Sequence, residues 1–168
     1  MKLHFGCGRN KLKGYLNCDL SSKVKPDRVL DITKELPFED NSVEEIVINH
    51  TLEHLENIFE VLSEFYRICE DKAIIKIRVP YFSHESAFST MTHVRFFTYT
   101  SFDFLDKNHL CHYDSINGDF KVINKRLHWR KCFFFFESLF NLFPRVYQEL
   151  FCWWFPAKEL YVELEVRK

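Results

Sequence analysis

The amino-acid sequence predicts a single α/β domain built on a mostly parallel β-sheet. Three observations support this class: short apolar runs recur along the first half, one segment has the period of an amphipathic helix, and the last run alternates apolar with charged residues. A chain of 168 residues is in the usual range for one domain with a substantial core, so we expect residues 1–168 to form a single unit.

The first two predicted strands frame a glycine turn. Residues 2–5 are a short apolar run that leads directly into Gly6, Cys7 and Gly8, the pattern of a buried strand with a sharp turn at its carboxyl end. A second run ends at Asp19. Ten residues separate Gly8 from Asp19, too few for the crossover helix that normally joins parallel strands, so we expect a loop or one helical turn there.

Three more strands are expected before residue 81. Residues 28–32 form a short strand that presents Asp31 at its end. The β-branched run at 45–50 predicts a buried strand, and residues 73–79 predict another, which Pro80 ends.

One amphipathic helix is expected between the fourth and fifth strands, over residues 57–70. Asn57 followed by Glu60 fits a helix-capping box. Apolar residues from Ile58 to Cys69 recur at helical spacing and fall on one face.

The second half is less regular. Residues 81–117 show no sustained period and are expected to form an insertion over a site. A strand at 120–125 follows, then helical structure at 134–154 with a break near Pro144. The alternating run at 160–166 predicts a strand with one wet face, as suits an antiparallel edge.

Charge and cysteine content bear on the expected partners and on the cellular location. The 23 basic and 24 acidic residues nearly balance, which gives no general reason to expect a nucleic-acid partner. Six cysteines without a C-x-x-C pair are interpreted as reduced thiols, and a cytoplasmic location is expected.

A metal site is not predicted. His50 and His54 have the spacing of a chelating pair on a helix, but no third ligand stands at a telling spacing in the sequence.

Several polar residues stand at predicted strand ends. In an open α/β sheet ligands bind beyond the carboxyl ends of the strands. This edge should carry the turn at 6–8, Asp19, Asp31 and residues 49–50. A glycine turn with an acidic residue after the next strand suits an adenosine-containing ligand, because a carboxylate can accept both ribose hydroxyls.

Four stretches make this similarity specific: LHFGCGRN, NCDL, LDITKELPFEDNSVEEIVINHTLEHL and IIKIRVPYF. Together they resemble class I S-adenosylmethionine-dependent methyltransferases of the small type-11 kind, over residues 3–82. The resemblance implies a Rossmann-like sheet with an antiparallel C-terminal edge and reduced N-terminal helices. It also implies a cofactor half at 1–82, an acceptor-side half at 83–168, and S-adenosyl-L-methionine as the cofactor.

The resemblance assigns cofactor contacts residue by residue. The glycine turn would pass under the methionine part, Asp19 would hold the ribose, Asp31 would flank the adenine, and His50 would lie near the sulfonium. Relatives usually carry an acidic residue where this chain has His4, and the short link after Gly8 should leave one flank of the site open. The full set of implied cofactor-binding residues is Phe5, Gly6, Cys7, Gly8, Asp19, Leu20, Asp31, Ile32, His50 and Leu52.

Candidates for acceptor-side chemistry come from the insertion. Methyl transfer is a direct displacement, and a nearby base helps when the acceptor is a hydroxyl. His93 is the candidate base, with Arg95 as a clamp for an anionic acceptor and His84 and Tyr81 as further catalytic candidates. The alternative interpretation is that His93 and Arg95 only fix the loop by hydrogen bonds.

The expected function is methyl transfer to an oxygen of a small molecule or sugar. Two alternatives stay open: an RNA or protein methyltransferase, and an inactive cofactor-binding subunit that stabilises a true enzyme. The aromatic segment at 134–154 predicts a core role, with peripheral membrane contact or a homodimer as alternatives.

Overall fold

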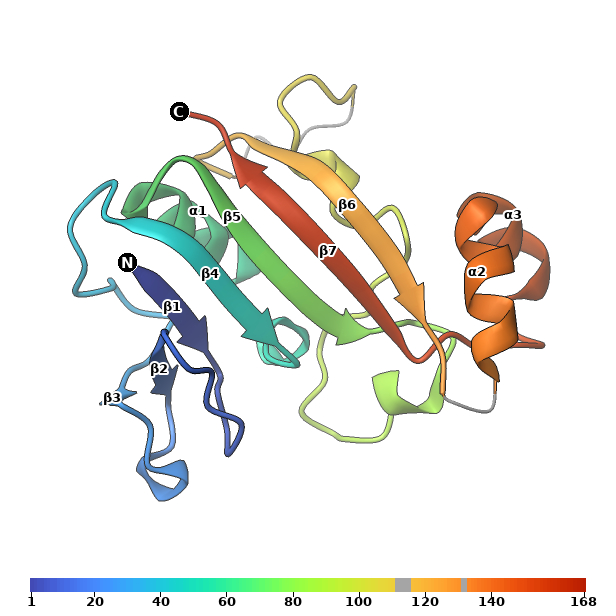
Figure 1. Cartoon of the computed structure of the whole chain (residues 1–168), viewed down its shortest axis with the longest axis horizontal. Coiled ribbons are helices and arrows are strands. Elements are labelled where there is room, and N and C mark those ends of the chain that lie inside the picture. The colour runs from blue at the N-terminus through green and yellow to red at the C-terminus, as the bar shows by residue number, and fades with distance from the viewer. Residues whose placement is uncertain (111–115, 131–132) are drawn as a thin grey trace.

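The computed structural model describes residues 1–110, 116–130 and 133–168. Across these residues the strands form one seven-stranded sheet in the order β3-β2-β1-β4-β5-β7-β6 (Figure 1). Strands β1 to β5 pair in parallel, whereas β7 is antiparallel to both of its neighbours, β5 and β6. The predicted class, a mostly parallel α/β sheet with an antiparallel C-terminal part, is confirmed.

Each strand predicted in the first half is present, but β3 ends at Val29, so Asp31 lies beyond the strand and not at its end as predicted. The strands are β1 (Lys2–Phe5), β2 (Leu16–Asp19), β3 (Arg28–Val29), β4 (Val43–Asn49), β5 (Cys69–Pro80), β6 (Phe120–His128) and β7 (Glu159–Val166). The helices are α1 (Ile58–Ile68), α2 (Phe134–Leu142) and α3 (Pro144–Val146), with short helical turns η1 (Ser22–Val24), η2 (Leu52–His54), η3 (Glu85–Ala87), η4 (Asp103–Leu105) and η6 (Tyr147–Phe151).

Helix α1 packs against the middle of the sheet, as its apolar face predicts. The rings of Phe5 and Phe65 stack with centroids 5.2 Å apart, which ties β1 to α1. The predicted capping box does not form, because the Asn57 side chain makes no capping hydrogen bond. Strand β5 starts at Cys69, directly after the helix, and not at residue 73 as predicted.

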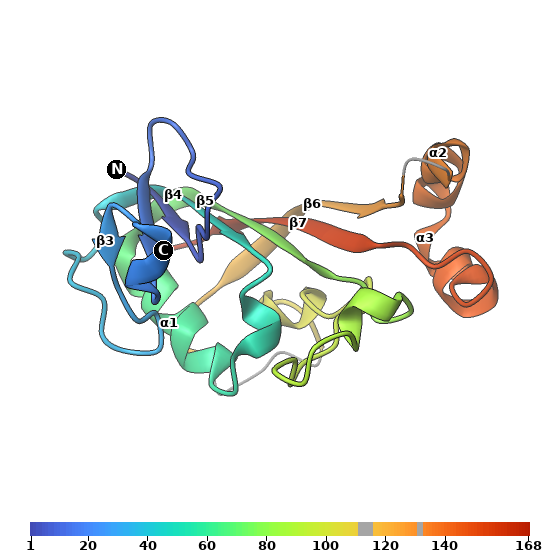
Figure 2. The same ribbon diagram turned by 90° about the horizontal axis from the view of Figure 1, so that it is seen from below.

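Within the described residues, a helix covers the sheet on one face only (Figure 2). Helix α1 and the segment 81–110 lie on the same side of the sheet, and the opposite side carries the N-terminal loops (Figure 2). The register sorts the side chains accordingly. Buried on the α1 face are Leu3, Phe5, Ile46, Ile48, Ile75, Ile77, Val79, Leu160, Val162 and Leu164.

The opposite face is lined by charged and hydroxyl-bearing side chains in mutual contact. At its centre Glu45 accepts a hydrogen bond from Lys76 at 2.7 Å, another from Lys2 at 3.2 Å, and one from the Tyr15 hydroxyl. Further along, the Arg78 guanidinium lies 5.7 Å from the centre of the Tyr161 ring. Ion pairs and a cation–π contact thus occupy the position that a second helical layer has in most parallel sheets.

This open face explains the alternation in the last strand. The prediction of an edge position for 160–166 is wrong, because β7 lies between β5 and β6, and β6 is the edge. Charged residues alternate along β7 because one face of the whole sheet is open to water, and not because the strand is terminal.

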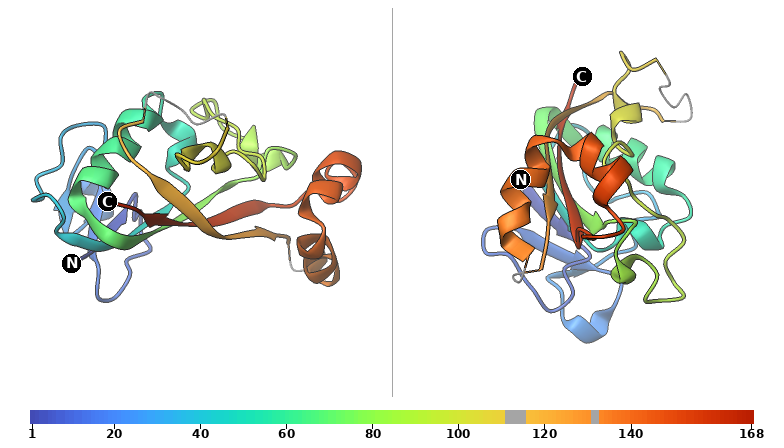
Figure 3. Two further views of the ribbon diagram at one scale, coloured as in Figure 1. Left: turned by 90° about the horizontal axis from the view of Figure 1, so that it is seen from above. Right: turned by 90° about the vertical axis from the view of Figure 1, so that its right-hand side faces the viewer.

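The segment after β5 returns along the α1 side of the sheet (Figure 3). A single bridge pairs Tyr81 with Phe97. The only helical turns of this segment, within residues 81–110, are η3 and η4. It contributes Phe97, Phe102 and Leu105 to the core. The segment is therefore a covering insertion, although it is partly a core element.

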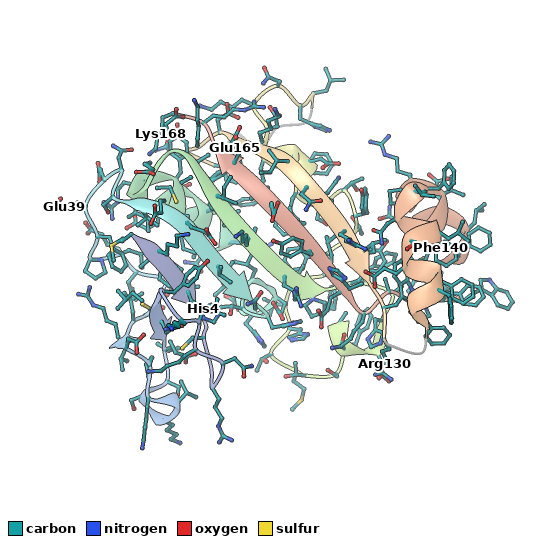
Figure 4. All side chains as sticks on the ribbon, in the orientation of Figure 1. His4, Glu39, Arg130, Phe140, Glu165 and Lys168 are labelled. Carbon is teal, nitrogen blue, oxygen red and sulfur yellow. The ribbon has the colours of Figure 1, made fainter. Side chains whose placement is uncertain are left out.

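Helices α2 and α3 with η6 form a helical unit beyond the ends of β6 and β7 (Figures 1 and 4). Phe140, labelled in Figure 4, packs against Tyr147 at 4.8 Å and Trp129 at 5.7 Å between ring centroids. Among the described residues, no helix combines the length and apolar character needed to cross a membrane. Exposed on this unit are Phe133, Phe135, Leu139, Leu142, Phe143, Val146, Leu150, Phe151, Trp153 and Trp154.

The network at Glu45 predicts an acid-sensitive stability. Burial would raise the pKa of Glu45, but hydrogen bonds from Lys76, Tyr15 and Lys2 outweigh it and lower the pKa from 4.5 to about 2. Its contribution is therefore complete above about pH 4.5 and is lost as the pH falls towards 2. We expect Glu45→Gln to lower the unfolding free energy at pH 7 by about 1–2 kcal/mol, with a smaller effect at pH 3.

Denaturant unfolding of both proteins at pH 7 and pH 3 measures this difference. Glu165→Gln is the matched control, since Glu165 projects from β7 on the same face outside the Glu45 network. An equal loss at both pH values would contradict the account.

Candidate functional site

The glycine turn leaves β1 at the carboxyl edge of the sheet. Gly6 and Gly8 have φ angles of +62° and +51°, in the left-handed region that favours glycine. A Cβ on Gly6 would lie 2.0 Å from the Thr51 hydroxyl oxygen, so the turn packs closely on the chain after β4. A Cβ on Gly8 would meet nothing within 4 Å, so this part of the turn faces open space that a ligand can fill.

Asp19 is fixed beside this turn. One carboxylate oxygen accepts the Gly8 N–H at 2.8 Å, and the other accepts the Ser21 N–H at 2.9 Å. A carboxylate offers about four acceptor positions, so each oxygen retains a lone pair for a further donor. The side chain is oriented by the backbone and remains able to accept two hydroxyl groups.

The link between Gly8 and Tyr15 is a loop, as the short spacing predicts, and Asn17 holds it in place. The Asn17 side chain is 3% exposed and exchanges hydrogen bonds with Leu12, accepting its N–H at 2.8 Å and donating to its carbonyl at 3.2 Å. It also accepts from His4 at 3.1 Å. His4 therefore supports the loop from beneath.

The remaining cofactor candidates are spread along the same edge. Asp31 accepts hydrogen bonds from the Thr33 N–H at 2.9 Å and hydroxyl at 2.7 Å, and these two bonds lower the pKa of Asp31. Leu20 is exposed and can cover a ligand, whereas Ile32, Leu52 and Phe5 are buried. The last two can support the site only from behind.

Cys7 lies inside the glycine turn with 3% exposure. Burial and the neighbouring Asp19 raise the pKa of the thiol, so it is protonated at neutral pH. This suits a small turn residue and not a nucleophile.

His50 directly follows β4 and has a positive φ of 49°, and its ring lies between two carboxylates. Its two nitrogens lie 3.5 Å from Glu159 and 3.5 Å from Glu53. The nearby carboxylates of Glu159 and Glu53 raise the pKa of His50 to about 9. At neutral pH the ring is therefore an imidazolium and cannot act as a base.

Two of the catalytic candidates are enclosed by the protein. Tyr81 is fully buried, its hydroxyl donates to Gln148 at 3.2 Å, and burial raises its pKa. His84 is 6% exposed and accepts the Ser86 N–H at 3.0 Å as the cap of η3, and burial lowers its pKa. Both have structural partners in this arrangement.

His93 and Arg95 lie against η2. Arg95 donates to the carbonyls of Leu55, at 2.7 Å, and Glu56, so its guanidinium binds the chain itself. His93 donates from Nδ1 to the Ala87 carbonyl at 2.9 Å, and its Nε2 lies 3.9 Å from Glu53 Oε1. The second ring nitrogen of His93 therefore faces Glu53.

Three side chains that support or contact candidate site residues were not assigned from the sequence: Asn17, Glu53 and Glu159. Asn17 and Glu53 lie inside the quoted stretches NCDL and HTLEHL, so their place in these motifs was the available signal. Glu159 is far along the chain and reaches His50 only through the pairing of β7 with β5.

A cavity of about 360 Å³ lies between α1 and residues 94–105, and the catalytic candidate Arg95 contributes to its lining. Aromatic side chains such as Phe59 and Phe96 line it together with polar ones such as Ser101. A second cavity, of about 240 Å³, adjoins Ile32 and α1.

His109, Cys111 and His112 form a further cluster of possible ligands in the sequence, and the structure describes it only in part. Residues 111 and 112 lie outside the described part of the chain. His109 contacts the Phe104 ring, with centroids 4.8 Å apart.

Comparison with protein families supports the resemblance seen in the sequence. Residues 3–77 match the family model described as a methyltransferase domain. This range contains the glycine turn, Asp19, Asp31 and His50. Comparison with curated protein sequences finds no match.

Solved structures show the same fold at low identity. An S-adenosylmethionine-dependent methyltransferase from Archaeoglobus fulgidus is 17% identical, with a TM-score of 0.68 over 98% of this chain and 85% of that one. Another from Mesorhizobium loti is 12% identical, with a TM-score of 0.61 over 98% and 89%.

A third similar structure comes from a complex. It contains the Trm112 methyltransferase activator and a second protein of Haloferax volcanii; identity is 15%, with a TM-score of 0.62 over 99% and 82% of the two chains. At these identities the likeness concerns the fold.

Proposed function

We propose that this chain is a class I S-adenosylmethionine-dependent methyltransferase and that it methylates an oxygen atom of a small molecule or sugar. The family model matched over residues 3–77 and the shared fold of solved methyltransferases support this proposal. The cofactor is S-adenosyl-L-methionine. The observation that supports the assigned site most directly is the anchored Asp19 carboxylate, which retains free lone pairs beside the open side of Gly8.

In this proposal the adenosine lies along the edge from Asp19 to Asp31. The Asp19 carboxylate accepts the ribose hydroxyls, and Asp31 with Ile32 flanks the adenine. The methionine part crosses the turn of Gly6, Cys7 and Gly8. These contacts need only the groups that the protein leaves available.

The acceptor side lies between His50 and the segment after β5. Methyl transfer from a sulfonium needs alignment of the nucleophile and exclusion of water more than it needs covalent catalysis. The His50 imidazolium can donate a hydrogen bond to an anionic or carbonyl oxygen there. Among the four catalytic candidates, His93 has a second ring nitrogen, Nε2, that makes no hydrogen bond of normal length and lies 3.9 Å from Glu53 Oε1.

The position of His93 supports an oxygen acceptor. A hydroxyl must lose its proton as it is methylated, and a histidine can take it directly or through one water. The His93 side chain is 7% exposed, so a water-mediated transfer fits the geometry better than direct contact. The near balance of charge disfavours the RNA alternative.

We propose a cytoplasmic location, since Cys7, Cys18, Cys69 and Cys152 are free thiols in the described part of the chain.

We further propose that the unit of α2, α3 and η6 mediates self-association. Its exposed side carries many large apolar residues but only balanced charge, with Arg145 and Glu149 four residues apart. A two-fold dimer allows Arg145 of each chain to meet Glu149 of the other, whereas an anionic membrane would favour an excess of basic residues.

The proposed cofactor site predicts that Asp19→Ala weakens binding of the cofactor product. The variant removes both ribose acceptors, so we expect the affinity for S-adenosylhomocysteine to fall at least about tenfold. Isothermal titration calorimetry measures it, with the exposed Glu39→Gln as the control of unchanged affinity. Equal affinity in wild type and Asp19→Ala would remove Asp19 from the site.

A role for His93 in the reaction predicts separate effects on turnover and binding. We expect His93→Ala to reduce methyl transfer to sugars and small alcohols by about 10²-fold or more, with affinity for S-adenosylhomocysteine within about twofold. Unchanged turnover would reduce His93 to a loop-fixing role. Cofactor binding without turnover on any acceptor, in wild type, would instead favour the inactive partner subunit.

If the helical unit mediates self-association, substitutions of Trp153 and Trp154 should disrupt the dimer. Trp153 and Trp154 are 67% and 80% exposed, and we expect Trp153→Ser with Trp154→Ser to convert a dimer to a monomer. Sedimentation velocity tests this, with Met91→Ser as an exposed apolar control on another surface. A monomeric wild type that co-sediments with phosphatidylcholine vesicles would replace the dimer by a membrane contact.

A further inference from the structure

Three side chains from two separate segments meet beside the candidate site. Glu53 and His54 come from η2, and His93 comes from the segment after β5. One ligand atom of each lies within 4.8 Å of the others. The two segments are fastened by the backbone, because the Glu53 carbonyl accepts the N–H groups of Val94 at 2.9 Å and Arg95 at 3.2 Å.

Glu53 is unusual because it is buried and incompletely paired. Its side chain is 1% exposed, and its Oε2 atom has no hydrogen-bond partner. Its other oxygen lies 3.5 Å from His50 Nδ1 and 3.9 Å from His93 Nε2, both longer than a normal hydrogen bond. A buried carboxylate oxygen without a partner is costly, so this oxygen calls for a further positive group.

The two histidines are oriented in the way that metal ligands usually are. His54 Nδ1 contacts the Thr92 carbonyl at 3.3 Å, and His93 Nδ1 contacts the Ala87 carbonyl at 2.9 Å. A carbonyl can only accept, so Nδ1 carries the proton in each ring, and in the neutral form Nε2 has the lone pair. Such backbone contacts fix the tautomer and orientation of metal-binding histidines.

We propose that Glu53, His54 and His93 bind a divalent transition cation such as Zn²⁺ or Mn²⁺. Two imidazole nitrogens and one carboxylate are a common ligand set for these ions. Ligands at about 2.0–2.2 Å from a tetrahedral ion are about 3.4 Å apart, so the cluster closes by a small movement. The exposed His54 ring can make that movement, and its side of the site leaves coordination positions for water or an oxygen ligand.

The cation would also suit the acceptor chemistry, a consequence that rests on the proposed function. A hydroxyl bound to a divalent cation loses its proton more readily than a free one. The cation would then replace the His93 lone pair in assisting proton removal. The binding proposal itself depends only on the three ligands.

Calorimetric titration of the chelator-treated full chain with ZnCl₂ and, separately, MnCl₂ tests the site. We expect saturable binding of one cation per chain, weakened at least about tenfold in His54→Ala and in Glu53→Gln. Glu56→Gln is the matched control, because it removes a nearby exposed carboxylate outside the cluster and should leave the affinity unchanged. Mn²⁺ binds thiols weakly, so binding of Mn²⁺ would report on this site and not on the cysteines.

Two further measurements keep the result interpretable. His54 is exposed, so His54→Ala should fold even if the buried Glu53→Gln does not, and circular dichroism reports folding in each. Wild type should also gain thermal stability with added MnCl₂, and His54→Ala should not. No saturable binding, or equal affinity in wild type and the folded cluster variants, would overturn the proposal. Parallel titrations with S-adenosylhomocysteine separate a failure of the metal site from a failure of the proposed function.

Discussion

The covering of the sheet on one face only is the constraint on which the rest of this structure depends. Parallel strands usually lie between two helical layers. Here β1, β4, β5 and β7 bury apolar side chains under α1 and present charged ones to water on the other side. The Glu45 network makes that exposed side compatible with folding, because each buried part of the carboxylate is hydrogen-bonded.

The lack of a helix on this face also affects the candidate site. With a loop in place of a crossover helix after β1, the glycine turn needs another support, and Asn17 supplies it. The proposed cofactor edge is consequently more open than a helix-flanked one. The proposed acceptor side is more enclosed, because η2 and the segment after β5 bury the side chains of Glu53 and His93 and hold them in place.

The sequence predicted the parts of the fold that depend on local pattern. Helix α1, the strands of the first half and the loop after Gly8 follow from periodicity and spacing. The open face was missed, although Glu45, Lys76 and Arg78 alternate with apolar residues in β4 and β5, because each strand was interpreted separately. The meeting of Glu53 with His93 was missed because the two are far apart in sequence, and no local period reports a contact made by a loop.

The most direct test of the account is a structure of the chain with S-adenosylhomocysteine bound. We expect the ribose hydroxyls on the Asp19 carboxylate, the adenine beside Asp31 and Ile32, and the sulfur turned towards His50. The ligand found instead in the cavity between α1 and residues 94–105, with Asp19 uncontacted, would contradict the account.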